Sequence, residues 1–115
     1  MITAQSIAGG VAAGTTSAET VARDTLARIA AYALIQPAVW IHRVSEADVL
    51  ASARAVDARI AAGEVLPLAG VPFAIKDNID LAGSPTTAAG VVRRVYVSEG
   101  QVIHPGAAML AIEPA

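Results

Sequence analysis

Cysteine is absent from this chain, and so are apolar runs of membrane-spanning length. Without cysteine there is no disulfide, no thiolate nucleophile and no thiolate metal site, which fits a reducing compartment. No apolar stretch approaches the roughly 20 residues that span a bilayer, and the N-terminus has no basic segment ahead of an apolar one. The sequence therefore predicts a cytoplasmic protein without a membrane segment.

An excess of one charge is also lacking, because the formal net charge is −2 and basic and acidic residues are interspersed. There is no basic stripe for nucleic acid and no basic cluster for anionic lipid. The two histidines, His42 and His104, lie far apart without a carboxylate at ligand spacing. Gly9, Gly10 and Gly14 lack the preceding strand and following lysine of a phosphate-binding loop. We expect no nucleic acid, no metal and no cofactor.

Aromatic residues are scarce, at 3%, although hydrophobic residues reach 55% and charged residues only 16%. This balance excludes an ordinary disordered acidic or basic chain. Much of the apolar fraction is alanine, which buries little area per residue. A chain of 115 residues therefore suffices for one small domain with a modest core.

Two segments carry the signals of amphipathic helices. The run Thr16-Ser17-Ala18-Glu19 has the form of a capping box, and apolar residues then recur at helical spacing as far as residue 32. A second capping signal, Ser45-Glu46-Ala47-Asp48, opens a segment with one apolar face that ends at Gly63. We predict a helix after each signal, whereas the glycines at 9, 10 and 14 indicate a loose N-terminal stretch.

Four further segments have the composition of strands: 38–44, 68–75, 91–97 and 109–112. The run 68–75 is continuously apolar and is flanked by proline and glycine, as in a buried strand. We predict an α/β fold in which two amphipathic helices pack on a small sheet that includes residues 71–75. A β-hairpin follows at the C-terminus.

Lys76 is the only lysine in the chain and comes directly after the apolar run. Desolvation at the end of a buried strand would lower the pKa of its ammonium group, so that a neutral amine could act as a general base. The alternative is a lysine whose head group extends into solvent at a strand end. The residues alone leave both interpretations open.

The motif Leu-Ala-Gly-Val-Pro-Phe-Ala-Ile-Lys-Asp-Asn-Ile-Asp at 68–80, followed by Gly-Ser-Pro-Thr-Thr at 83–87, resembles the segment that carries the catalytic lysine in the amidase-signature family. Segments 17–32, 38–43 and 53–57 are similar in order to allophanate hydrolases of that family. The resemblance implies that Lys76 takes a proton from a bridging serine, which activates a nucleophilic serine toward an amide carbonyl.

The serines that this mechanism needs are missing. The family carries them in a Gly-Gly-Ser-Ser-Gly-Gly-like stretch, no such stretch occurs here, and Ser84 and Ser98 lie in other contexts. We therefore expect the chain to be catalytically silent by itself, and whether it is an enzyme stays open.

The tail, from 90 to 102 with 105–106 and 109–113, is similar to the closing half of a biotinyl/lipoyl barrel. It contains no lysine, so it cannot carry biotin. The two resemblances occur together in urea amidolyases, which suggests a large internal deletion, a decayed gene or a chimera with its junction between Pro85 and Gly90. We predict two incomplete regions, 1–88 and 89–115.

Three functional hypotheses follow. The preferred one is an N-terminal fragment of an amidase-signature hydrolase, similar to allophanate hydrolase, that cleaves the amide C–N bond of a small amide in urea or allophanate metabolism only when missing segments complete it. The alternative is a non-catalytic assembly module that uses the half-barrel, and the third is a relic without function. Exposed strand edges also predict a homo-oligomer, with residues 91–112 as its contact.

Overall fold

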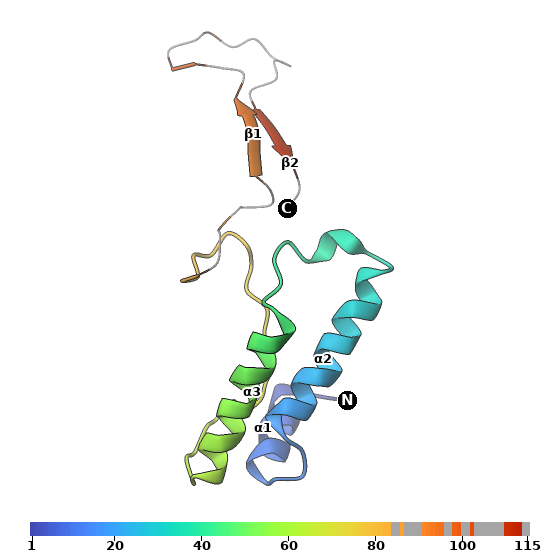
Figure 1. Cartoon of the computed structure of the whole chain (residues 1–115), viewed down its shortest axis with the longest axis vertical. Helices are drawn as coiled ribbons and strands as arrows, with labels where there is room; N and C mark the ends of the chain where they lie inside the picture. Colours follow the sequence, from blue (N-terminus) through green and yellow to red (C-terminus); the bar gives the residue numbers. More distant parts are fainter. Residues whose placement is uncertain (84–85, 87–90, 96–97, 100–101, 103–109, 114–115) are drawn as a thin grey trace. The chain divides into compact units, whose positions relative to one another are not determined.

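The computed structural model describes residues 1–83, 86, 91–95, 98–99, 102 and 110–113 (Figure 1). The chain divides into two compact units. The first, here called the helical unit, comprises residues 1–37 and 43–74, and the second comprises residues 38–42 and 75–115. Lys76 belongs to the second unit.

The helical unit contains α1 (Ala4–Ala12), α2 (Ala18–Ala33) and α3 (Glu46–Ala61), and α3 contacts both of the other helices (Figure 1). Both predicted helices, α2 and α3, are confirmed. The predicted apolar face of α3 is also confirmed, since Val49, Ala53, Val56 and Ile60 are all half-buried. These helices pack on one another, whereas the prediction had placed them on a sheet.

The start of α3 follows its sequence signal. Ser45 is the N-cap residue, and its hydroxyl accepts a hydrogen bond from the Asp48 amide at 3.1 Å. At the other end Gly63 adopts a φ of +86°, which favours glycine, and the Glu64 amide donates to the Arg59 carbonyl at 3.0 Å. The Gly63 amide donates to the Ile60 carbonyl at 2.9 Å, which completes a Schellman motif.

Helix α1 was not predicted, because its two glycines indicated a loose segment. Thr3 and Ser6 form a reciprocal capping box at its start, with the Ser6 amide donating to the Thr3 hydroxyl at 3.0 Å. The N-terminal prediction was therefore wrong. A β-carbon on Gly10 would lie 3.2 Å from the Thr16 methyl group, so the missing side chain lets the following turn approach α1 closely.

The core of the helical unit is small and is built from short side chains. Val11, Ala18 and Ala69 are each only 2% exposed and form its centre. Around them pack five partly buried hydrophobic residues: Val21, Ala53, Val56, Ile60 and Leu66. The abundance of alanine thus leads to a thin core, as the composition indicated.

The predicted α/β fold is wrong. Residues 38–44 begin with the end of the short 3-10 helix η1 (Pro37–Val39) and continue as irregular chain, and residues 68–75 form a turn and then irregular chain. A strand needs a neighbour for its backbone groups, and within the described residues nothing pairs with 71–75 as a sheet would require. The apolar composition of this run therefore misled the prediction.

In the second unit, β1 (Val91–Val95) and β2 (Leu110–Glu113) pair antiparallel, with Val91 opposite Glu113 and Val95 opposite Leu110. The register shifts between Val92 and Arg94. The residues that would form the turn of the predicted hairpin lie mostly outside the described part, so no hairpin is described. This pair lies apart in sequence from the helices and does not restore the predicted architecture.

Candidate functional site

The residues that precede Lys76 in the sequence, Ala69 and Gly70, are tightly packed in the helical unit. Ala69 is 2% exposed, and Gly70 has a φ of +67°. A β-carbon on Gly70 would lie 2.9 Å from Val11 Cγ2, closer than real β-carbons pack, and 3.0 Å from Ala18 Cβ, which is tighter than most real contacts. Only glycine fits here, and its position fixes the chain six residues before Lys76.

Ala18, the residue on which Gly70 packs, is itself held by α3. The Asp57 carboxylate accepts the Ala18 amide at 2.7 Å and the Glu19 amide at 3.0 Å, one with each oxygen. The Ser17 hydroxyl accepts the next amide, that of Thr20, at 3.0 Å. These amides have no partner within a helix, so Asp57 and Ser17 together satisfy the first turn of α2.

The capping box predicted for α2 was therefore wrong, because the Glu19 carboxylate does not accept a backbone amide at the start of the helix. Glu19 does not turn back to the cap. Its carboxylate accepts hydrogen bonds from Arg54 Nε of α3 at 2.9 Å and from Arg23 Nη2 at 2.6 Å. The Arg54 hydrogen bond, followed by that of Arg23, lowers the pKa of Glu19 from 4.5 to about 2. Sequence reasoning missed Asp57, although a carboxylate directly after Val56, on the apolar face of a helix, was a usable signal.

Lys76 itself is exposed, and its carbonyl accepts the Ile79 amide at 3.0 Å in a turn. Of the two interpretations left open by the sequence, desolvation at the end of a buried strand does not describe these residues, because Phe73 is 82% and Ile75 40% exposed. A few residues on, Thr86 Oγ1 donates to Asp80 Oδ1 at 2.8 Å. The role of Lys76 as a general base stays a prediction.

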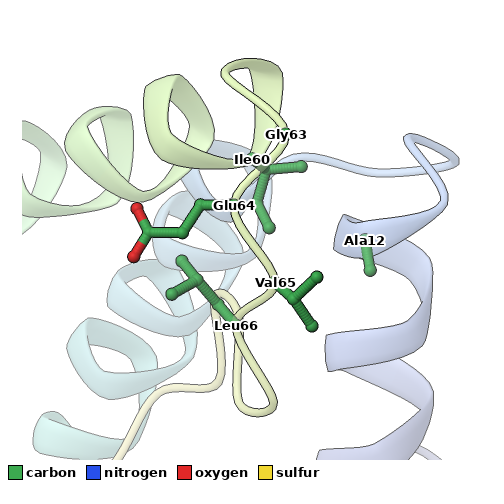
Figure 2. A pocket seen from close by; sticks show the side chains of 6 residues that line it. All are labelled: Ala12, Ile60, Gly63, Glu64, Val65 and Leu66. Carbon is green, nitrogen blue, oxygen red and sulfur yellow. The ribbon is translucent and has the colours of Figure 1, made fainter.

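A hollow of about 260 Å³ lies at the end of α3 in the helical unit (Figure 2). Ala12, Ile60, Gly63, Glu64, Val65 and Leu66 line it. Glu64, the only charged member of this set, is bound by the Arg59 guanidinium, which lowers the pKa of the Glu64 carboxyl. Figure 2 shows that carboxylate directed away from Ala12. The hollow is mainly apolar and does not include Lys76, so we do not assign the reaction to it.

The other residues considered from the sequence are only partly described. His42 and Ser98 are both exposed, whereas Ser84 and His104 lie outside the described residues. Among the residues that the structure describes, no three His, Asp or Glu side chains are grouped so that they would hold a metal ion. Within the same part of the chain, no helix combines the length and the apolar character that a bilayer crossing needs.

Comparison with known proteins identifies the class. Residues 21–103 match the model of the Amidase family, and the chain belongs to that family. The matched residues include the Lys76 motif and extend past residue 88. The division into 1–88 and 89–115 stays a prediction, since residues 87–90 lie outside the described part.

The curated relatives described here share one name, that of a subunit of glutamyl-tRNA(Gln) amidotransferase. The protein of Acidothermus cellulolyticus is 53% identical over 87 residues, which is 74% of this chain and 17% of the relative. Those of Deinococcus deserti and Symbiobacterium thermophilum are 36% and 45% identical and are covered to 19% and 18%, with 84% and 75% of this chain aligned. The chain thus spans less than a fifth of these relatives. No solved structure gives a significant match.

These comparisons narrow the resemblances drawn from the sequence. The amidase-signature family is confirmed. The relatives named here are neither allophanate hydrolases nor urea amidolyases, and neither the family match nor these relatives support a biotinyl/lipoyl tail.

Proposed function

We propose that this chain supplies the general-base lysine of an enzyme that cleaves amide C–N bonds, and that it acts only together with a segment that carries the nucleophilic serine. One observation carries the proposal: the only lysine of the chain, Lys76, stands in the 68–80 motif inside the family match. Because the chain has no other lysine, Lys76 is the lysine to which the general-base role is assigned.

In the proposed reaction, the neutral Lys76 amine takes the proton of a bridging serine, which in turn deprotonates the nucleophilic serine. The serine oxygen attacks the amide carbonyl carbon, and the C–N bond breaks as the leaving nitrogen receives a proton. Water then hydrolyses the ester, which releases the carboxylate and restores the serine. Both serines belong to the completing segment, because the sequence has no Gly-Gly-Ser-Ser-Gly-Gly-like stretch.

The name of the relatives bears on the reaction, the partner and the substrate. It describes one component of an amidotransferase, so the amide nitrogen in those proteins is transferred and further chains are present. We take from this the reaction class and the need for a partner chain. The name also refers to glutamine, whose side chain is a primary amide, so glutamine is the first candidate substrate. Allophanate is the second candidate, because segments 17–32, 38–43 and 53–57 are similar to allophanate hydrolases.

A chimera tests the proposal. This chain replaces the matching 87 residues of the Acidothermus cellulolyticus relative, and ammonia release from glutamine and from allophanate is measured. We expect release from at least one substrate and a loss of about 100-fold or more in Lys76→Met, the size of effect that a general base contributes.

Arg28→Met is the matched control, since Arg28 is an exposed cation on α2. It should leave the rate unchanged. Equal rates for Lys76→Met and the unaltered chimera would refute the assigned role, and a folded chimera that releases no ammonia from either amide would refute the proposed function.

A further inference from the structure

The hollow of about 260 Å³ in the helical unit has no part in the proposed reaction (Figure 2). Its volume lies between that of an apolar cavity of about 150 Å³ that holds benzene and the roughly 300–1,000 Å³ of drug-sized sites. The side chains of Ile60, Val65 and Leu66 give it apolar walls, and Val65 is 88% exposed, so solvent reaches this wall. The hollow therefore suits a molecule of a few heavy atoms with an apolar body.

Two helices end at this hollow. Ala12, which lines it, is the last residue of α1, and Ile60 and Gly63 line it at the end of α3 (Figure 2). The C-terminal end of a helix carries a partial negative charge of about half an elementary charge, which favours a cation nearby. Two such ends beside one hollow favour a positively charged ligand.

The basic side chains of these two helices do not offset that charge. The last turn of α1 has no basic residue, and that of α3 has only Arg59. Arg59 Nε donates to Glu64 Oε2 at 2.7 Å, and Arg59 Nη2 donates to Glu64 Oε1. Because the guanidinium is paired with a carboxylate, the pair has no net charge and leaves the negative potential of the helix ends in place.

The backbone that lines the hollow also offers acceptors. Within the part of the chain that the structure describes, the carbonyl oxygens of Ala12, Gly63 and Val65 accept no backbone amide. An ammonium group has three donors and no acceptor, so carbonyl oxygens are suitable partners for it.

We propose that this hollow binds a small primary amine in its ammonium form, with the ammonium group at the unpaired carbonyls and a short alkyl chain against Ile60, Val65 and Leu66. A carboxylate of the same length would meet two negative helix ends, and a neutral alcohol would gain little from them. The inference is independent of the proposed function, since Lys76 does not line the hollow.

The experiment titrates pentylammonium, pentanoate and 1-pentanol into the full chain and follows the backbone amides by nuclear magnetic resonance. Pentylammonium should shift the amides of Gly63, Val65 and Leu66 and bind at least about fivefold more tightly than 1-pentanol, the effect expected of two helix ends. Pentanoate should bind more weakly than either. Equal binding of the three ligands, or amide shifts that do not include these residues, would overturn the proposal.

A substitution in the wall tests the place of binding. Ala12→Leu puts a larger side chain on the wall of the hollow and should weaken pentylammonium binding at least about fivefold, because it fills the space that the alkyl chain occupies. Ala13→Leu is the control, since Ala13 is exposed next to Ala12 but does not line the hollow. Helical circular dichroism checks that both variants fold, and equal binding by the two would contradict the assigned site.

A second substitution tests the electrostatic basis. Arg59→Met leaves the charge of Glu64 unpaired beside the hollow, so pentylammonium should bind at least about twofold more tightly. Arg28→Met removes an exposed cation from α2 and should bind as the unaltered chain does. Unchanged or weaker binding by Arg59→Met would show that charge does not select the ligand, and the proposal would be wrong.

Discussion

Gly70 combines a left-handed backbone with a crowded position. Its φ is +67°, and a β-carbon would lie 2.9 Å from Val11 Cγ2. Gly70→Ala should therefore lower the free energy of unfolding by at least about 2 kcal/mol, because the backbone cost of an L-residue and the overlap with the core add. Urea unfolding followed by circular dichroism measures the change.

Gly14 provides the matched control for that prediction. Its φ is +71°, but among the described residues, chain neighbours aside, no atom lies within 4 Å of the place a β-carbon would take. Gly14→Ala should cost only about 1 kcal/mol, the backbone part alone. If both substitutions lower the free energy of unfolding by the same amount, the close packing of Gly70 on α1 and α2 adds nothing to the cost of Gly70→Ala.

Asp57, on α3, binds two backbone amides of α2. Its removal should therefore lower the free energy of unfolding more than the removal of an ordinary exposed carboxylate does. Asp57→Ala should reduce the free energy of unfolding by about 1–2 kcal/mol, because the Ala18 and Glu19 amides lose their partner at the start of α2. Asp24→Ala, an exposed change on α2, should stay within about 0.5 kcal/mol. Equal losses in thermal or urea unfolding would contradict the capping role.

At the scale of elements, α2 and α3 are joined by Glu19 and Arg54. Since the pKa of Glu19 is lowered from 4.5 to about 2, the ionised form is favoured by folding. The resulting stability is fully present above pH 4.5 and is lost as the pH falls toward 2. The difference in urea midpoint between the unaltered chain and Glu19→Gln should therefore shrink across this interval.

Glu46→Gln is the control for this pH dependence. Glu46 is an exposed acid in the first turn of α3, and Glu19 is a half-buried acid in the first turn of α2, so both substitutions remove the same charge from the first turn of a helix. A midpoint difference for Glu19→Gln that does not depend on pH between 4.5 and 2 would contradict the assigned hydrogen bonds.

The elements differ in how far the sequence predicts them, and the reason is physical. The start of α3 depends on Ser45 and Asp48 and its end on Gly63, which are local signals, and both ends were predicted correctly. The run 68–75 has strand composition, but a strand depends on a distant neighbour that the described chain does not provide. Its irregular, exposed state could not be foreseen from apolar residues alone.

The candidate site shows the same contrast. The motif around Lys76 was sufficient to recognise the family, because it is a continuous run of sequence. Asp57 and Gly70 act through contacts between α1, α2, α3 and the loop that follows, and such contacts leave only weak traces in the pattern of residues. Neither was proposed as important from the sequence.

For the whole molecule, the chain contains a candidate base but lacks the serine motif, and the structure exposes Lys76 to solvent. A lysine that water surrounds, with no serine motif to activate, cannot form the acyl-enzyme on which the proposed reaction depends. We therefore expect the purified chain alone to release no ammonia from glutamine or allophanate above the rate of buffer. Ammonia release that survives purification and disappears in Lys76→Met but not in Arg28→Met would show that the chain holds a complete site, and the dependence on a completing segment would then be wrong.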